Sequence, residues 1–322
     1  MPSLSPEEIG KRRLVAVVGP TAVGKTELSI ELAKSYGGEI INADSRQIYR
    51  GMDIGTAKPT AQQREVVPHH LYDIVDPSKQ YSLNLYRRDA HEAMEGIWRR
   101  NCLPFVVGGT GQYVWALLEN WTVPEVAPDE VLRNELKLYA DQLGVQKLHD
   151  RLRDVDPEAA NKIHPRNVRR VIRALEVHTH TGRPISEWQS KGQPDFSYSV
   201  VGIDLPDAID SSMNRAKSAE HITRINRRTE KIFEDGLLEE TKVLLDAGVS
   251  PDASALTSIG YREAVSVLHG EASEEKAIEL TKRSTKRLAR RQRQWFRRED
   301  KRIIWVSNLA DAMTAMESMI LH

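Results

Sequence analysis

A glycine-rich segment near the N-terminus has the residue types that bind a polyphosphate. It reads Gly19-Pro20-Thr21-Ala22-Val23-Gly24-Lys25-Thr26 and fits every fixed position of the pattern G-x-x-x-x-G-K-[ST]. Its glycines let successive backbone N–H groups point inward, and a helix that follows adds positive potential. Lys25 supplies a charge for a phosphate oxygen, and Thr26 a hydroxyl for Mg²⁺. We therefore predict a diphosphate site, although kinases, ATPases and switches share this motif.

A second loop carries a carboxylate. The run Asn42-Ala43-Asp44-Ser45-Arg46-Gln47-Ile48-Tyr49 follows an apolar stretch that we expect to be a strand. Asp44 should then emerge beside the phosphate loop, where a base can act on an attacking group. Aspartate before a polar run also often caps a helix. From the residues alone, both interpretations of Asp44 stay open.

Alternating apolar runs and helical patterns predict the elements that position these loops. We expect strands at 14–18, 39–42 and 104–107, and helices at 26–36 and 112–119. The third strand ends in Gly108-Gly109-Thr110-Gly111. Strands that alternate with helices indicate a parallel α/β sheet, which binds ligands at the carboxyl ends of its strands. Both glycine loops should lie at that edge, in a P-loop NTPase-like sheet flanked by helices.

The middle of the chain has a different pattern. Strand signals stop after residue 121, and 129–142, 145–153 and 167–179 have helical periodicity between prolines. Strands are expected again at 199–205 and 302–306. We therefore predict a catalytic core from 1–121 and 199–322, interrupted by a helical insertion domain at 122–198.

Composition limits the class of protein. Among 322 residues, 46 basic and 46 acidic side chains cancel, so overall charge gives no reason to expect a nucleic acid. The single cysteine, Cys102, excludes an internal disulfide and a multi-thiolate zinc site. His69 and His70 are adjacent without further ligands, which makes them weak metal candidates. No run of 18 apolar residues occurs, and we expect a cytoplasmic protein with no membrane partner.

Basic residues nevertheless cluster locally. Near the C-terminus they recur in steps of three or four, at Lys282, Lys286, Arg290, Arg293 and Arg297. A second cluster in the insertion comprises Arg166, Arg169, Arg170 and Arg173. Such a stripe is usually a solvated helix face, but it also suits contact with an RNA backbone. Two clusters in one chain favour RNA.

Several blocks occur in the order typical of one family. Besides the phosphate loop and residues 44–49, they are Met52-Asp53-Ile54-Gly55-Thr56-Ala57-Lys58-Pro59, Val67-Pro68-His69-His70-Leu71, Val107 to Gly111, 161–177, Ile259-Gly260-Tyr261, Arg290-Arg291-Gln292 and Trp295-Phe296-Arg297. With these blocks the chain resembles the bacterial-type tRNA dimethylallyltransferases over nearly its whole length.

The resemblance implies a reaction and a catalytic site. The family transfers the dimethylallyl group of dimethylallyl diphosphate to N6 of adenosine 37 in tRNA. Lys25 and a Mg²⁺ ion on Thr26 would then stabilise the charge on the leaving diphosphate, and Asp44 would be the base. Thr110 would bond the bridging oxygen, while Arg224 would reach the diphosphate from the other half of the chain, with Arg228 a weaker companion.

The resemblance also implies a tRNA partner. The target adenine would leave its stack to reach Asp44, and the insertion would contact the anticodon stem-loop. We expect a monomer. The predicted RNA-binding residues are Asp44, Ser45, Arg46, Gln47, Thr110, Arg133, Arg166, Asn167, Arg169 and Arg170.

Two departures and several rival functions accompany this prediction. Gln112 stands where the family commonly has leucine, and the stretch 207–219 is longer and more polar than expected. The lone cysteine excludes the C-terminal zinc finger of eukaryotic relatives. The rivals are an adenylate isopentenyltransferase, a small-molecule P-loop kinase and a non-catalytic RNA-binding protein. ATP turnover without a prenyl donor would identify a kinase.

Overall fold

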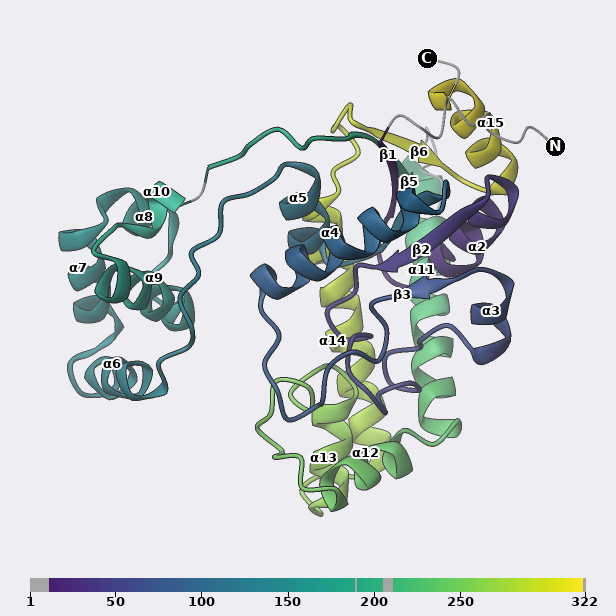
Figure 1. Cartoon of the computed structure of the whole chain (residues 1–322). Helices are drawn as coiled ribbons and strands as arrows, with labels where there is room; N and C mark the ends of the chain where they lie inside the picture. The colour runs from purple at the N-terminus through teal and green to yellow at the C-terminus, as the bar shows by residue number, and fades with distance from the viewer. Residues whose placement is uncertain (1–11, 189, 205–210, 321–322) are drawn as a thin grey trace. The chain divides into compact units, whose positions relative to one another are not determined.

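The computed structural model describes residues 12–188, 190–204 and 211–320 (Figure 1). The chain divides into two compact units, one formed by Met1–Leu118 with Pro194–His322 and the other by Glu119–Gln193. Each has its own core and is described separately. Of the stretch 207–219, residues 207–210 lie outside the described residues, and the structured portion starts a long helix at Ser211.

The described residues of the larger unit form a parallel sheet of six strands, in the order β3-β2-β4-β1-β5-β6. The strands are β1 (Arg13–Val18), β2 (Gly38–Asn42), β3 (His69–His70), β4 (Leu103–Gly108), β5 (Ser197–Ile203) and β6 (Ile303–Val306). β1 and β4 pair in register from Val15 opposite Phe105 to Val18 opposite Gly108. Because both faces of these central strands are covered, their sequences are continuous apolar runs.

The predicted α/β fold class is therefore confirmed, with small shifts at the ends of elements. β5 begins at Ser197, so the last residues of the predicted insertion 122–198 pair with β1. The edge strand β3 was not predicted. It has two residues, too few for a periodic pattern, and exists through pairing with β2.

Helices cover both faces of the sheet (Figure 1). On one face lie α2 (Lys25–Ser35) and α15 (Leu309–Ile320), whose Leu32 and Met316 share a core with Val17 and Phe105. On the other, α4 (Leu83–Arg99) packs against β2, β4 and α5 (Gly111–Leu118). Tyr86 of α4 stacks on Tyr113 of α5, with ring centroids 4.0 Å apart. The preceding residue, Gln112, is exposed.

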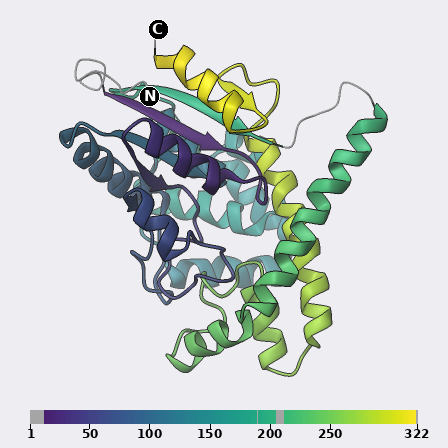
Figure 2. The same cartoon turned by 90° about the vertical axis from the view of Figure 1, so that its right-hand side faces the viewer.

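A second core holds the helices that follow β5. The helices are α11 (Ser211–Glu234), α12 (Leu237–Asp246), α13 (Tyr261–Leu268) and α14 (Glu274–Trp295). Figures 1 and 2 show α11 and α14 packed against each other below the sheet. Ile48 and Met52, from the chain after β2, are buried with Phe233 and Tyr261 of these helices. The helices therefore support the loop that carries Asp44.

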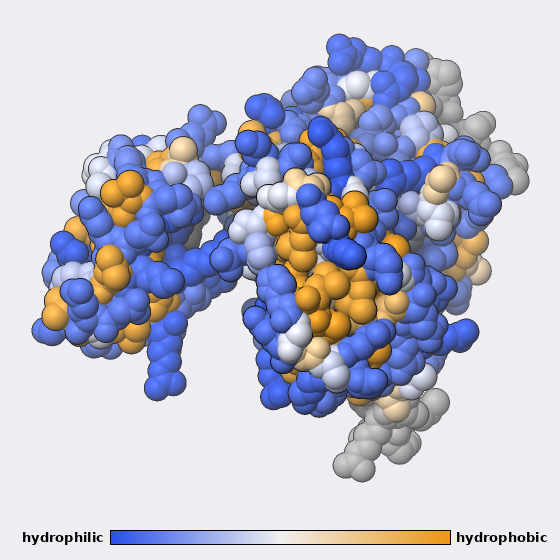
Figure 3. All heavy atoms as spheres, turned by 90° about the horizontal axis from the view of Figure 1, so that it is seen from below, coloured by the Kyte–Doolittle hydropathy of each residue, from blue (hydrophilic) through white to orange (hydrophobic). Residues whose placement is uncertain are grey.

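Apolar side chains also reach the surface of this unit. Figure 3 shows them gathered on its lower face, the end at which α12 and α13 lie. Val243 of α12 is 66% exposed. Among the described residues, no helix is both long enough and apolar enough to cross a membrane.

The smaller unit is wholly helical in its described residues. It contains α6 (Glu130–Leu143), α7 (Val145–Val155), α8 (Pro157–Lys162), α9 (Val168–Thr181) and α10 (Ile185–Trp188). The helices predicted at 129–142, 145–153 and 167–179 are confirmed, with ends that move by one or two residues. Asp129 and Asp156 cap α6 and α8 by accepting from Leu132 N and Ala159 N. Leu148, Leu152 and Val171 centre the core of the unit.

Candidate active site

The glycine-rich loop connects the end of β1 to the start of α2. Gly24 has φ +95°, a conformation that costs glycine nothing, and α2 begins at Lys25 without a side-chain cap. Leu28 N donates to Gly24 O, so the N–H groups before it have no partner within the helix. The predicted strand, loop and helix are thus in place. The helix start offers backbone donors and a positive dipole to an anion.

Lys25 is held inside the loop that it belongs to. Its Nζ donates to Pro20 O at 2.7 Å. Burial, and then the nearby Arg228, lowers the pKa of Lys25 to about 8, although Asp44 opposes the shift. The ammonium group is therefore still mostly charged at neutral pH, and an anion that enters restores the charge balance.

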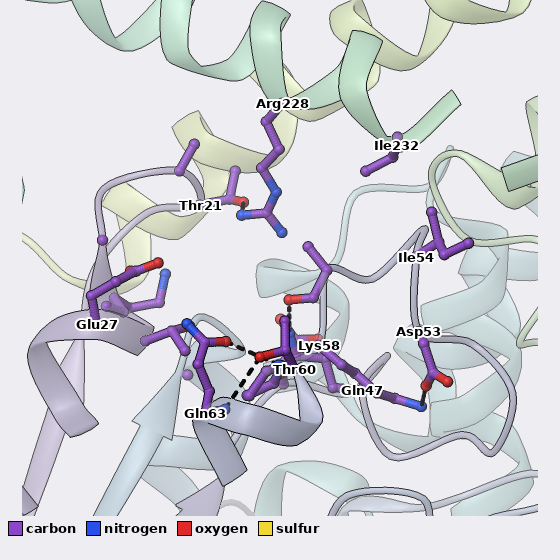
Figure 4. A pocket seen from close by; sticks show the side chains of 18 of the residues that line it. Thr21, Glu27, Gln47, Asp53, Ile54, Lys58, Thr60, Gln63, Arg228 and Ile232 are labelled. Carbon is purple, nitrogen blue, oxygen red and sulfur yellow. Dashed lines mark hydrogen bonds and ion pairs between the residues drawn. The ribbon is translucent and has the colours of Figure 1, made fainter. Parts of the chain in front are cut away.

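Next to this loop is a cavity of about 1130 Å³ (Figure 4). Of the predicted site residues, it is lined by Thr21, Ala22, Gly24, Lys25, Thr26, Asp44, Gln47 and Arg224. Among the described residues, Gly19, Pro20, Val23, Ser45, Arg46 and Thr110 do not line it. Val23 is buried beneath the loop, 4% exposed. All lining residues come from the larger unit.

Asp44 is half-buried in the cavity wall and shapes a tight turn. Its Oδ1 accepts from Arg46 N at 2.9 Å, and its own N–H donates to Asn42 Oδ1 at 2.8 Å. Residues 45–48 form turns rather than a helix, so Asp44 is not a helix cap. Oδ2 accepts no hydrogen bond from any residue that the structure describes. One carboxylate oxygen thus fixes the turn and the other stays available to take a proton.

Thr110 ties the second glycine loop to the Asp44 loop. Its Oγ1 accepts from Ser45 N at 3.0 Å, and its N–H donates to Ala43 O at 3.1 Å. This close approach requires Gly108, because a Cβ there would lie 2.2 Å from the Ala43 carbonyl. The structure therefore brings Ser45 and Thr110, predicted from distant blocks, into direct contact.

The two arginines of α11 occupy different environments. Arg224 lines the cavity but is exposed and pairs with Glu220 at 2.8 Å, one turn back along its helix. Arg228 is half-buried, and its guanidinium donates to Thr21 Oγ1 at 3.3 Å (Figure 4). Burial lowers the pKa of Arg228. Arg228 thus lies against the phosphate loop, whereas the sequence blocks ranked it below Arg224.

The other predicted RNA-binding residues of the Asp44 loop already have partners. Arg46 donates to Ser254 O at 2.7 Å. Gln47 Nε2 donates to the carbonyls of Thr56 and Ala57, at 3.1 and 3.2 Å. These contacts hold the loop against neighbouring segments of the cavity wall.

Glu240 of α12 is a structural residue that the sequence blocks missed. Its carboxylate accepts from the consecutive backbone N–H groups of Asp53, Ile54 and Gly55, at 2.8, 2.9 and 3.2 Å. It also accepts from the hydroxyl of Tyr261 at 2.5 Å. The family-like segments 52–59 and 259–261 are therefore joined through one carboxylate, which belongs to neither block.

The basic residues of the smaller unit fall into two groups. Arg166, Asn167, Arg169 and Arg170 are exposed. Arg133 and Arg173 instead pair with Glu176, whose side chain is fully buried, at 2.8 and 2.5 Å. Because removal of a buried partner is costly, these two arginines have a structural role in the unit.

The C-terminal basic stripe is also divided. Lys282 pairs with Glu230, and Arg293 forms a bidentate pair with Asp204 at 2.8 Å. Arg290 is exposed, and Trp295 is 40% exposed. Some residues of the stripe therefore form ion pairs within the larger unit, and others are exposed.

A hard oxygen ligand is present for Mg²⁺. The Thr26 hydroxyl, the predicted Mg²⁺ ligand, belongs to a residue that lines the cavity. No group of three or more His, Cys, Asp or Glu side chains suited to a metal occurs in the described portion of the chain. His69 and His70 bond Val67 O and Glu39 instead.

A parallel sheet with a glycine-rich loop between its first strand and the following helix is a P-loop-like fold. The family model described as IPP transferase matches residues 47–299, and that of isopentenyl transferase matches residues 12–69. The chain belongs to the IPP transferase family.

Relatives support the same assignment. A tRNA dimethylallyltransferase of Thermomicrobium roseum is 47% identical over 295 residues, covering 92% of this chain and 86% of the relative. A solved tRNA isopentenylpyrophosphate transferase of Bacillus halodurans is 40% identical, with a TM-score of 0.68 and coverage of 97% and 96%. A solved eukaryotic dimethylallyltransferase acting on tRNA is 28% identical, with a TM-score of 0.74 and coverage of 95% and 77%.

Proposed function

We propose that this chain transfers the dimethylallyl group of dimethylallyl diphosphate to N6 of adenosine 37 in tRNA. The observation that carries the proposal is the shared cavity of Lys25, Thr26 and Asp44, which combines anion-binding groups with a carboxylate that has one unengaged oxygen. The names of the relatives given above describe enzymes that act on tRNA. A kinase can also place a carboxylate base beside its phosphates, so the similarity to these relatives is what favours the transferase over a kinase.

The phosphate loop would bind the leaving diphosphate. Backbone N–H groups at the start of α2 and the ammonium of Lys25 meet the negative charge that grows as the C–O bond breaks. Arg228 adds a second, poorly hydrated cation at Thr21. Thr26 would hold Mg²⁺, which as a Lewis acid supplies further charge stabilisation when bound.

Asp44 would act on the nucleophile. The N6 lone pair of adenine is delocalised into the ring, so a base that takes the N6 proton makes attack on the dimethylallyl carbon easier. The Asx-type bond from Oδ1 to Arg46 N fixes the carboxylate, and Oδ2 would accept the proton. Thr110 would turn its hydroxyl hydrogen from Ser45 Oγ, 3.4 Å away, to the bridging oxygen while a lone pair still accepts from Ser45 N.

The tRNA would bind through exposed cations. Arg166, Arg169 and Arg170 have no buried partner of the kind that holds Arg133, so their charges are available to phosphates. The adenine would have to leave its stack, because its N6 is inaccessible to Asp44 within a helix of stacked bases.

Incubation with labelled dimethylallyl diphosphate, Mg²⁺ and tRNA, followed by nucleoside analysis, tests the proposal. Label in N6-dimethylallyladenosine at position 37 is the expected result. Transfer to free adenylate but not to tRNA would support the adenylate isopentenyltransferase instead. ATP turnover without the donor would support the kinase.

A further inference from the structure

One buried glutamine joins the two glycine loops of the site. Gln292 of α14 is 5% exposed. Its Oε1 accepts from Thr21 N at 2.8 Å, and its Nε2 donates to Gly109 O at 3.1 Å. A Cβ on Gly109 would lie 2.1 Å from Nε2, so glycine is needed for the amide to fit. The side chain therefore sets the spacing between the phosphate loop and the Thr110 loop.

The peptide that Gln292 binds is also the one that holds Lys25. The peptide between Pro20 and Thr21 gives its N–H to Gln292 and accepts the Lys25 ammonium on its carbonyl. Rotation of this peptide would move both groups together, because a peptide is planar. The position of the Lys25 charge thus depends on Gln292, which lies 271 residues after Thr21.

The next peptide, which carries Thr21 O, is connected to α14 through His221. Thr21 O accepts from Nε2 of His221, which is 3% exposed, at 2.8 Å. Nδ1 of His221 accepts from Arg293 at 3.0 Å, and Arg293 is paired with Asp204. Only the neutral ring protonated at Nε2 satisfies both contacts. Neighbouring residues of α14 therefore fix two consecutive peptides of the phosphate loop.

This arrangement also decides which donors an anion can reach. Pro20 has no N–H, and the N–H of Thr21 is taken by Gln292. An anion is therefore bound by the later part of the loop and the start of α2, next to Lys25. A loop that lost its Gln292 contact would have a part-buried Thr21 N–H without this partner and freedom to turn away from this geometry.

We propose that Gln292, which also lines the cavity, is a positioning residue for diphosphate binding and acts by holding the Pro20–Thr21 peptide and Gly109 in place. The inference rests on the proposed function only in that a diphosphate is the anion bound. It can be measured without prenyl transfer, because the property at issue is the geometry of the empty loop.

Titration of the full chain with inorganic diphosphate and Mg²⁺ tests the inference. Gln292→Met keeps the length of the side chain but removes both hydrogen bonds, and we expect the Kd to rise about 10- to 100-fold. The matched control is Gln294→Met, the same change at an exposed position of the same helix, which should stay within about twofold. Equal affinity of Gln292→Met and the unsubstituted protein would overturn the inference.

A second variant adds a measurement, the pH dependence of the Kd for diphosphate, that a purely structural role of Gln292 would leave unchanged. Gln292→Glu keeps an acceptor for Thr21 N, but an ionised carboxylate has no hydrogen for Gly109 O and repels the ligand. Its Kd for diphosphate, divided by that of the unsubstituted protein at the same pH, should fall as pH falls, because protonation restores the donor for Gly109 O and removes the negative charge. A ratio independent of pH would overturn the inference.

The two variants also separate this inference from the proposed function. If Gln292→Met lost its cooperative thermal unfolding, the pH series of Gln292→Glu would decide. In transfer assays the KM for the donor should rise while the KM for tRNA is unchanged. Diphosphate binding with the expected contrast, but without transfer to tRNA, would refute only the proposed function. No diphosphate binding by the unsubstituted protein would overturn both.

Discussion

The two units use the same kinds of charged side chain in opposite ways. In the larger unit, Lys25 and Arg228 are half-buried against the phosphate loop, and burial lowers the pKa of both. In the smaller unit, Arg169 and Arg170 stand in solvent. Enclosed charges interact strongly and resist screening, whereas exposed charges act over a long range and are screened by salt. The contrast suits chemistry in one unit and recruitment of a polyanion in the other.

The largest effect should come from the enclosed carboxylate. Asp44→Asn keeps the shape and the acceptor for Arg46 N but cannot take a proton, so single-turnover transfer should fall by a factor of about 10² to 10⁴. Measurement at saturating donor and tRNA isolates this step. Asp235→Asn, the same change elsewhere in the cavity wall, should have little effect. If Asp44→Asn stayed within a few-fold of wild type, Asp44 would be a turn residue only.

The exposed cations should show the next largest effect. Reversal of charge at Arg169 and Arg170 to glutamate should weaken tRNA binding by about tenfold or more and reduce the salt slope by about one per lost phosphate contact. Filter binding at several salt concentrations measures both. Lys137→Glu with Lys147→Glu makes the same charge change on exposed residues of the same unit. An equal loss in this control would mean that only net charge matters.

The pH dependence of donor binding should sharpen the comparison. Since the pKa of Lys25 is lowered to about 8, the ammonium is lost as pH rises through that value. The KM for the donor should rise above about pH 8, by up to tenfold per pH unit, while the KM for tRNA changes less. Lys25→Arg should flatten this limb, because arginine stays protonated. The same rise in the arginine variant would assign the titration to another group.

The smallest effect should be on stability. Burial lowers the pKa of His221, with Arg293 adding to the shift, so the folded chain binds fewer protons than the unfolded chain below pH 6.5. The stability from neutral His221 is complete above that pH and is lost as pH falls toward the folded pKa. His221→Gln, which can still donate to Thr21 O, should therefore lose a few degrees less Tm on acidification than wild type. Parallel Tm curves would contradict this.

The sequence predicted most of what depends on local pattern. Central strands were evident because burial on both faces makes them continuous apolar runs, and the helices of the smaller unit because one face is apolar. The phosphate loop and Asp44 followed from motif and family blocks. The edge strand β3 and the exact ends of β5 were missed, since pairing with a neighbour defines them.

Contacts that depend on tertiary structure could not be predicted from the sequence. Nothing in the block Arg290-Arg291-Gln292 says that its glutamine meets Thr21, 271 residues earlier. The resemblance to the family likewise ranks Arg224 above Arg228. The helix geometry turns Arg228 toward Thr21, while Arg224 pairs with Glu220. Glu240 lay between blocks and had no signal at all.

Glu240 has a consequence for how the cavity wall responds to its surroundings. Three consecutive backbone N–H groups, those of Asp53, Ile54 and Gly55, form an anion cradle much like a phosphate loop, but its anion is tethered to α12. A tethered ligand has an effective concentration in the millimolar range or above, so free phosphate in solution competes with it poorly. The Glu240 carboxylate therefore serves as a covalently attached counterion for residues 53–55. The chain thus has one cradle that its own carboxylate occupies and, beside it, a glycine-rich loop for which we propose a ligand from solution.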